Sequence, residues 1–168
     1  RGYFCAMRWP FGSILVLSII LLVSCGGEDP CGTFYQPYPD VVSTRFRTER
    51  NSLYLDAMGA YARRDYASAA DQLKIYVEQH RNEDAARLYL CCAYLSTGRP
   101  YVAELQLDFI EQGGRPGFRD QVDWYNAMCL TCSGQYDRAV EQADKILAAK
   151  THTYKVEAQR LKEALQAK

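Results

Sequence analysis

This sequence of 168 residues has no excess of charge of either sign, because 20 lysine and arginine residues balance 20 aspartate and glutamate residues. A nucleic-acid-binding protein needs a concentrated basic surface that releases counterions, so nucleic acid is not an expected partner. Six prolines and eleven glycines are too few for a collagen-like or disordered chain. Since 48% of the residues are apolar, a packed fold is expected.

Residues that support catalysis are equally scarce. Only two histidines occur, His80 and His152, and their separation offers no Ser–His–Asp or Cys–His arrangement. No glycine-rich loop follows a strand pattern, so a phosphate-binding loop is not predicted. We therefore expect a chain that is not an enzyme, with no catalytic residues, no metal site and no cofactor.

No apolar run is long enough to cross a bilayer, which takes about 20 helical residues. The longest run, residues 14–23, has no charge and follows Arg8. A basic residue followed by a short apolar segment is typical of a signal peptide. We predict a signal peptide over residues 1–24, with Met7 as the expected true start.

The apolar run ends in the sequence LVSC at residues 22–25, which resembles the lipobox of bacterial lipoproteins. The resemblance implies that Cys25 is lipidated and anchors the protein, since several acyl chains together hold a protein stably in a membrane. Glu28-Asp29 resembles the export signal of Bacteroidetes surface lipoproteins. The expected location is therefore the cell envelope, at the outer membrane, facing the periplasm or the cell surface. An ordinary signal peptide with an incidental cysteine is the alternative.

Residues 25–47 are predicted to be the lipidated cysteine and a flexible tether. The segment after Cys25 contains three prolines, three glycines and no helical period. Its aromatic residues Phe34, Tyr35 and Tyr38 could still pack on the first helix of the domain that follows.

The domain over residues 48–168 contains an internal repeat. Residues 54–61, 88–95 and 124–131 each place larger or apolar residues at i, i+3, i+4 and i+7, which is typical of one helix face. A second helix follows each time, with an alanine at positions that are 34 and then 36 residues apart, namely Ala69, Ala103 and Ala139.

This pattern over residues 48–150 resembles the tetratricopeptide repeat (TPR). The resemblance implies an all-α fold, an antiparallel helix-pair solenoid of about three TPR-like repeats. Residues 153–167 have one apolar and one charged side, so we predict a C-terminal capping helix there. An unrelated helical bundle is the alternative.

In TPR proteins the first helices of the pairs line a concave groove, and the resemblance implies a partner-binding groove here. Its candidate residues are Tyr89, Tyr125, Ser96, Cys129, Cys132 and Arg63. Tyrosine offers a flat face with a hydrogen-bonding tip, and small residues leave room for a ligand backbone. The alternative is that the tyrosines pack between helices.

The Cys129-x-x-Cys132 spacing could indicate a redox pair or half of a zinc site. The repeat places this pair in mid-helix, at the positions equivalent to Ala93 and Ser96 of the preceding copy. We therefore expect both cysteines to be small packing residues. A disulfide, a redox site or a metal site remain as alternatives. With Cys25 lipidated, five cysteines are left, and they cannot all pair.

The sequence therefore predicts a lipid-anchored interaction module that binds a peptide or partner protein in its groove. One alternative is a thiol-based redox or metal-binding role through Cys129 and Cys132. Another is a structural, self-associating lipoprotein whose groove is filled by its own residues 26–47.

Overall fold

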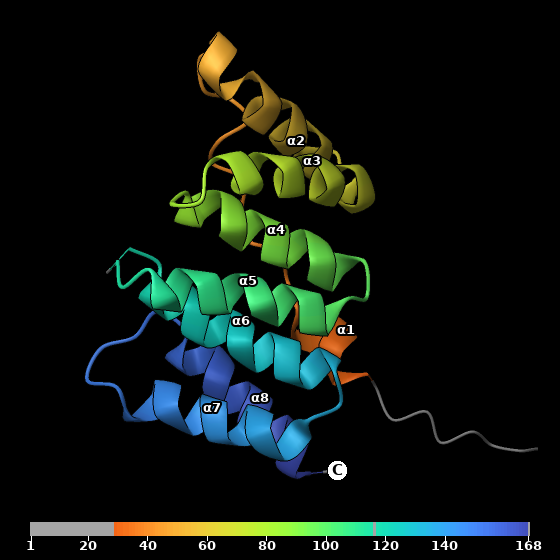
Figure 1. The fold of residues 1–168 in the computed structure, drawn as a ribbon. Helices are drawn as coiled ribbons and strands as arrows, with labels where there is room; N and C mark the ends of the chain where they lie inside the picture. The colour runs from red at the N-terminus through yellow and green to blue at the C-terminus, as the bar shows by residue number, and fades with distance from the viewer. Residues whose placement is uncertain (1–28, 116, 168) are drawn as a thin grey trace, which may run out of the picture.

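The computed structural model describes residues 29–115 and 117–167, and every regular element in these ranges is helical (Figure 1). The described part of the chain begins with the short helix α1 (Pro30–Phe34), followed by a 3-10 turn at Glu49–Asn51. The longer helices are α2 (Ser52–Ala62), α3 (Tyr66–Gln79), α4 (Asp84–Ser96), α5 (Pro100–Gln112), α6 (Arg119–Cys132), α7 (Tyr136–Ala148) and α8 (Lys155–Gln166).

From α2 onward, each helix packs against the next one along the chain, and α4 also contacts α6 (Figure 1). The prediction of an all-α fold with helices stacked in series is thus confirmed. The predicted helix over residues 153–167 is α8, which buries Ala158, Leu161 and Leu165. Within the described residues no helix is both long and apolar enough to span a membrane. The predicted signal peptide and Cys25 lie outside the described residues.

Small residues explain how closely the helices approach one another. Ala69, Ala103 and Ala139, the alanines of the sequence pattern, are all fully buried in α3, α5 and α7. A side chain of one carbon lets two helix backbones pack tightly, whereas a larger one would force them apart.

Three turns between helices share one geometry. Arg64, Gly98 and Gly134 all have positive φ values, of 63°, 71° and 75°. In each turn the next residue donates its N–H to a carbonyl of the preceding helix, as Arg99 does to Tyr94 at 2.9 Å. Arg64 therefore takes the left-handed conformation that glycine adopts more readily in the two later turns.

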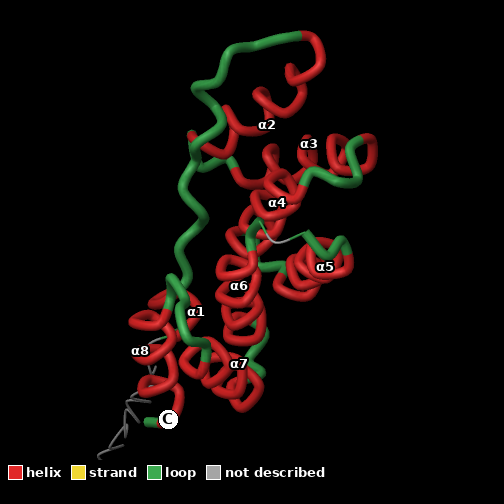
Figure 2. The backbone as a smooth tube through the Cα atoms, turned by 90° about the vertical axis from the view of Figure 1, so that its left-hand side faces the viewer, coloured by secondary structure: helices red, strands yellow, loops and turns green. Residues whose placement is uncertain are grey.

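The N-terminal segment differs most from the prediction. Residues 25–47 were expected to be a flexible tether, but the described part packs on the domain. α1 lies against α6 and α8, and the chain then runs back to α2 along the side of α4 and α6 that faces away from α5 (Figure 2). The correction follows from the covalent and polar contacts described next.

Candidate functional site

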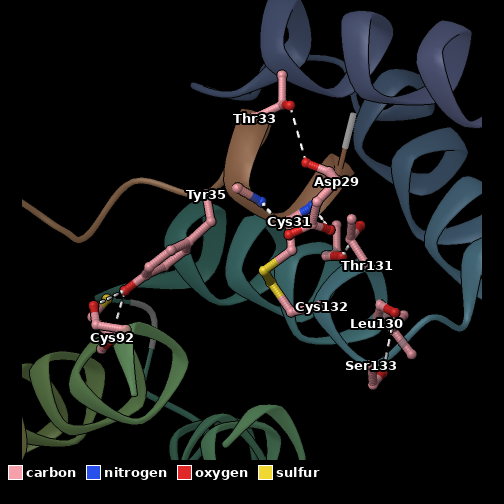
Figure 3. The surroundings of a disulfide bond; sticks show 12 residues. Asp29, Cys31, Thr33, Tyr35, Cys92, Leu130, Thr131, Cys132 and Ser133 are labelled. Carbon is pink, nitrogen blue, oxygen red and sulfur yellow. Dashed lines mark hydrogen bonds between the residues drawn. A yellow bond between two sulfur atoms is a disulfide. The ribbon is translucent and has the colours of Figure 1, made fainter. Parts of the chain in front are cut away.

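We call residues 29–42 the strap. The strap face is the surface of α2, α4 and α6 that the strap covers. One end of the strap is held covalently, because Cys31 forms a disulfide with Cys132 at the end of α6 (Figure 3). The Asp29 side chain caps α1 by accepting hydrogen bonds from the backbone N–H groups of Cys31 and Gly32, both at 3.1 Å. The start of the strap therefore has a fixed position against α6.

Tyrosine hydroxyls of the strap face bind the backbone of the strap. Three of them, from α6, α2 and α4, donate to strap carbonyls, namely Tyr125 to Gln36 (2.9 Å), Tyr61 to Tyr38 (2.8 Å) and Tyr89 to Pro39 (3.0 Å). The Tyr89 hydroxyl also accepts a hydrogen bond from the N–H of Val41 at 3.2 Å. These hydrogen bonds recognise the peptide backbone and do not depend on the identity of its side chains.

Side chains of the strap also contact the helices. The Tyr35 hydroxyl donates to the carbonyl oxygen of Cys92 at 2.6 Å and lies 2.9 Å from the Ser96 hydroxyl (Figure 3). The Tyr38 ring packs against Tyr89, with 5.7 Å between ring centroids. Val42, where the strap ends, is 1% exposed. Both ends of the strap are thus fixed, one by the disulfide and the other by burial.

Burial sets the protonation state of this site. Desolvation is the main cause that raises the pKa of Tyr61 and of Tyr125 well above the ordinary value, and the nearby Cys92 thiol raises it further. Burial also raises the pKa of Cys92 from 9.0 to about 12. At neutral pH these groups are uncharged, and the tyrosine hydroxyls remain hydrogen-bond donors.

The structure brings together four of the six candidate groove residues. Tyr89, Tyr125 and Ser96 contact the strap directly, and Cys132 holds it through the disulfide. Arg63 is exposed in the turn after α2, and none of the strap hydrogen bonds given above involves it.

The prediction that both cysteines are small packing residues is wrong for Cys132, which forms a disulfide with Cys31. A Cys129–Cys132 disulfide, one of the alternatives above, is also wrong, because Cys129 is a buried free thiol. Cys129 instead neighbours Cys91, whose pKa burial raises well above the ordinary value. A thiol of this kind is a weak nucleophile and a weak metal ligand, since the thiolate is the reactive form. Over the described ranges, no group of three or more His, Cys, Asp or Glu residues is placed to hold a metal ion.

Sequence reasoning missed two members of the site. Tyr61 was assigned only to the repeat pattern, although it binds the strap from the last turn of α2. Cys31 was assigned to the tether. A cysteine close to three aromatic residues in a segment without helical period was the available signal for a packed strap.

The strap face is therefore a tyrosine-lined surface that holds an extended polypeptide. The chain has no significant match among protein-family models, curated proteins or solved structures, so its function is argued from this geometry.

Proposed function

We propose that this protein is a lipid-anchored, non-enzymatic interaction module of the bacterial cell envelope, whose strap face binds an extended segment of a partner protein. The TPR resemblance of residues 48–150 supports the proposal, as do the helices packed in series and the shared turn geometry at Arg64, Gly98 and Gly134. Cys25 supplies the membrane anchor, which places the module at the outer membrane.

The observation that carries the proposal is the binding of strap carbonyls by three tyrosine hydroxyls from three different helices. Main-chain hydrogen bonds give affinity for any extended peptide, as they do where a strand is added to a sheet edge. The strap is the occupant of this surface within the chain itself. A partner segment competes with it and gains access most easily when the Cys31–Cys132 bond is open.

A second candidate function is structural, with the strap as a permanent filler of the strap face. The disulfide favours it, because a covalent bond keeps the strap at a high effective concentration next to its site. The two functions differ in whether a peptide can bind in place of the strap.

A fluorescein-labelled peptide of residues 33–42 serves as the probe. We expect it to bind the Cys31→Ser variant about tenfold or more tightly than the oxidised wild type, because loss of the disulfide lowers the effective concentration of the strap. Fluorescence anisotropy measures both affinities. The Tyr125→Phe change should weaken binding to the Cys31→Ser variant, whereas Tyr101→Phe, at an exposed position of α5, should not.

Absence of peptide binding to the Cys31→Ser variant would contradict the partner-binding function and leave the structural one. The anchor is tested independently by mass spectrometry of the mature protein. We expect an acylated N-terminal Cys25, and its Ser variant should leave the membrane fraction. An unmodified mature N-terminus would refute the anchor alone.

A further inference from the structure

A second groove lies on the opposite side of α4 from the strap. This outer groove, with a volume of about 600 Å³, is bordered by α3 and α5 and reaches Arg87, Leu90 and Tyr94 of α4. These residues follow the spacing i, i+3, i+7, as do Tyr89, Cys92 and Ser96 of the strap face. The two sets are offset by two residues, about 200° around a helix, so α4 presents opposite sides to the two grooves.

The α5 wall of the outer groove is apolar and open to solvent. Val102, Leu105 and Phe109 line it and are 42%, 48% and 43% exposed, respectively. Their spacing places them on one stripe, separate from the stripe of Ala103, Leu107 and Ile110 that α5 buries in the core. The exposed stripe extends about 10 Å along the helix.

A buried cation lies at the base of this apolar wall. Arg87 is 7% exposed, and its guanidinium lies 4.6 Å from the centre of the Phe109 ring. It donates to the carbonyl of Arg81 and to the side-chain oxygen of Gln106, both at 3.2 Å. No carboxylate in the described part of the chain forms an ion pair with it, because Asp84, the acid nearest in sequence, is bound by Arg115.

The charge of the outer groove is positive, in contrast to the neutral chain as a whole. Lys74, Arg81, Arg87 and Arg115 line it, and Glu78 is the one carboxylate among its lining residues. The charge of Arg115 is offset by its ion pair with Asp84, so the three other cations outnumber Glu78. Burying a cation without an anionic partner is costly, and a carboxylate that reaches Arg87 would remove that cost.

We infer that the outer groove is a docking site for an acidic amphipathic segment of a partner protein. A carboxylate of that segment pairs with Arg87, and its aliphatic side chains cover the stripe of Val102, Leu105 and Phe109. The exposed stripe favours a polypeptide over a small carboxylate, which could neutralise Arg87 but could not cover two turns of α5. The site functions with the strap in place, because the strap lies on the other side of α4.

The experiment uses the full chain, purified in a mild detergent, and a displayed library of random peptides of about 12 residues, roughly three helical turns. Peptides that also bind the Leu105→Glu variant are removed. This variant carries a negative charge on the exposed stripe, which repels an acidic peptide. We expect the remaining peptides to place an aspartate or glutamate within one turn of two aliphatic residues. One of the remaining peptides is then synthesised. The Arg87→Gln change in the protein, and replacement of the peptide's acidic side chain by the amide, should each weaken its binding about tenfold or more.

Two matched variants serve as controls. Val156→Glu, at an exposed position of α8, places the same charge outside the groove and should leave the affinity unchanged. Tyr125→Phe alters the strap face and should also leave it unchanged, which separates this inference from the proposed function. Leu105 is exposed, so its variant keeps the test valid even where Arg87→Gln disturbs folding.

Three outcomes overturn the inference. The recovered peptides lack an acidic residue, or every peptide that binds the wild type also binds the Leu105→Glu variant so that none remains after depletion, or acetate and butyrate completely displace peptides whose binding Leu105→Glu does not change. The last result would identify a site for small carboxylates instead.

Discussion

The Cys31→Ser variant is expected to unfold with a free energy about 4 kcal/mol below that of the oxidised wild type, since the disulfide closes a very long loop. Cys31 and Cys132 are 101 residues apart, so their bond restrains most of the described chain in the unfolded state. A bond that closes a loop of about 100 residues removes close to 5 kcal/mol of unfolded-chain entropy, and observed effects are usually somewhat smaller.

Urea denaturation, followed by the fluorescence of the buried Trp124 and by circular dichroism, measures this difference. A reductant should lower the stability of the wild type by a similar amount and leave the Cys31→Ser variant unchanged. Cys129→Ser is the matched control, because it removes a buried free thiol from the same helix without opening a disulfide. It should leave the response to reductant intact.

Combining Cys31→Ser with Cys132→Ser should add little to either change alone, because both remove the same bond. Additive losses, or a Cys31→Ser variant as stable as the wild type in the absence of reductant, would rule out this disulfide as the restraint.

The helices could be predicted from the sequence because their signal is local. The i, i+3, i+4, i+7 spacing and the buried alanines describe neighbours one turn apart, and these neighbours decide which face of a helix is buried. The second and third turns are marked by Gly98 and Gly134. The equivalent turn at Arg64 forms without glycine, because the packing of α2 on α3 holds the backbone there.

The strap could not be predicted in the same way, because an extended segment has no helical period and its contacts are distant in sequence. Its prolines favour a flexible tether when only the sequence is considered. In the structure Pro37 and Pro39 suit an extended strap whose carbonyls are bound, since proline lacks an N–H but keeps its carbonyl. Gln36 precedes Pro37, and a residue before proline is biased toward extended backbone.

The candidate groove shows the same limit. Tyr89 and Tyr125 follow from the repeat register and do bind the strap, whereas Arg63, near the turn, is not part of its hydrogen bonding. The sequence does not indicate the partner of Cys132, because Cys129 is its neighbour in sequence, whereas Cys31 lies next to it only through the packing of α1 on α6. Proximity along the chain is a poor guide to disulfide pairing when one cysteine lies in a strap.

High pH is expected to destabilise the protein steeply. Burial raises the pKa of Tyr54, Tyr61 and Tyr125 well above 10.0, their value in the unfolded chain. Above pH 10 the unfolded state therefore loses protons that the folded state keeps, and the free energy of unfolding falls as the pH rises. The stabilisation from keeping these groups neutral is complete below pH 10, and these three tyrosines together cost about 4 kcal/mol by about pH 11.

The buried thiols add an effect that begins at lower pH. Cys92 has an ordinary pKa of 9.0, raised by burial to about 12 in the folded chain. Above pH 9 the thiol of the unfolded chain loses a proton that the folded chain keeps. Its contribution to stability is therefore lost progressively as the pH rises above 9. The curve of stability against pH should thus bend downward near pH 9 and steepen above pH 10.

Urea denaturation at a series of pH values measures the slope. Burial raises the pKa of other tyrosines as well, including Tyr35 and Tyr154. Tyr125→Phe should therefore reduce the loss of stability by the share of one group, about 1.4 kcal/mol by about pH 11. It should also lower stability at neutral pH by about 1 kcal/mol, because the carbonyl of Gln36 loses its hydrogen-bond donor. Tyr101→Phe, at an exposed position, should change neither quantity.

A stability that is equal at neutral and high pH would mean that these hydroxyls ionise in the folded state and hence are not buried. An unchanged slope in Tyr125→Phe would exclude Tyr125 in particular, and with it the hydrogen bond from Tyr125 to the strap. The pH dependence therefore tests the strap face independently of the disulfide, because the tyrosines that bind the strap backbone stay neutral only while the strap and the helices exclude water from them.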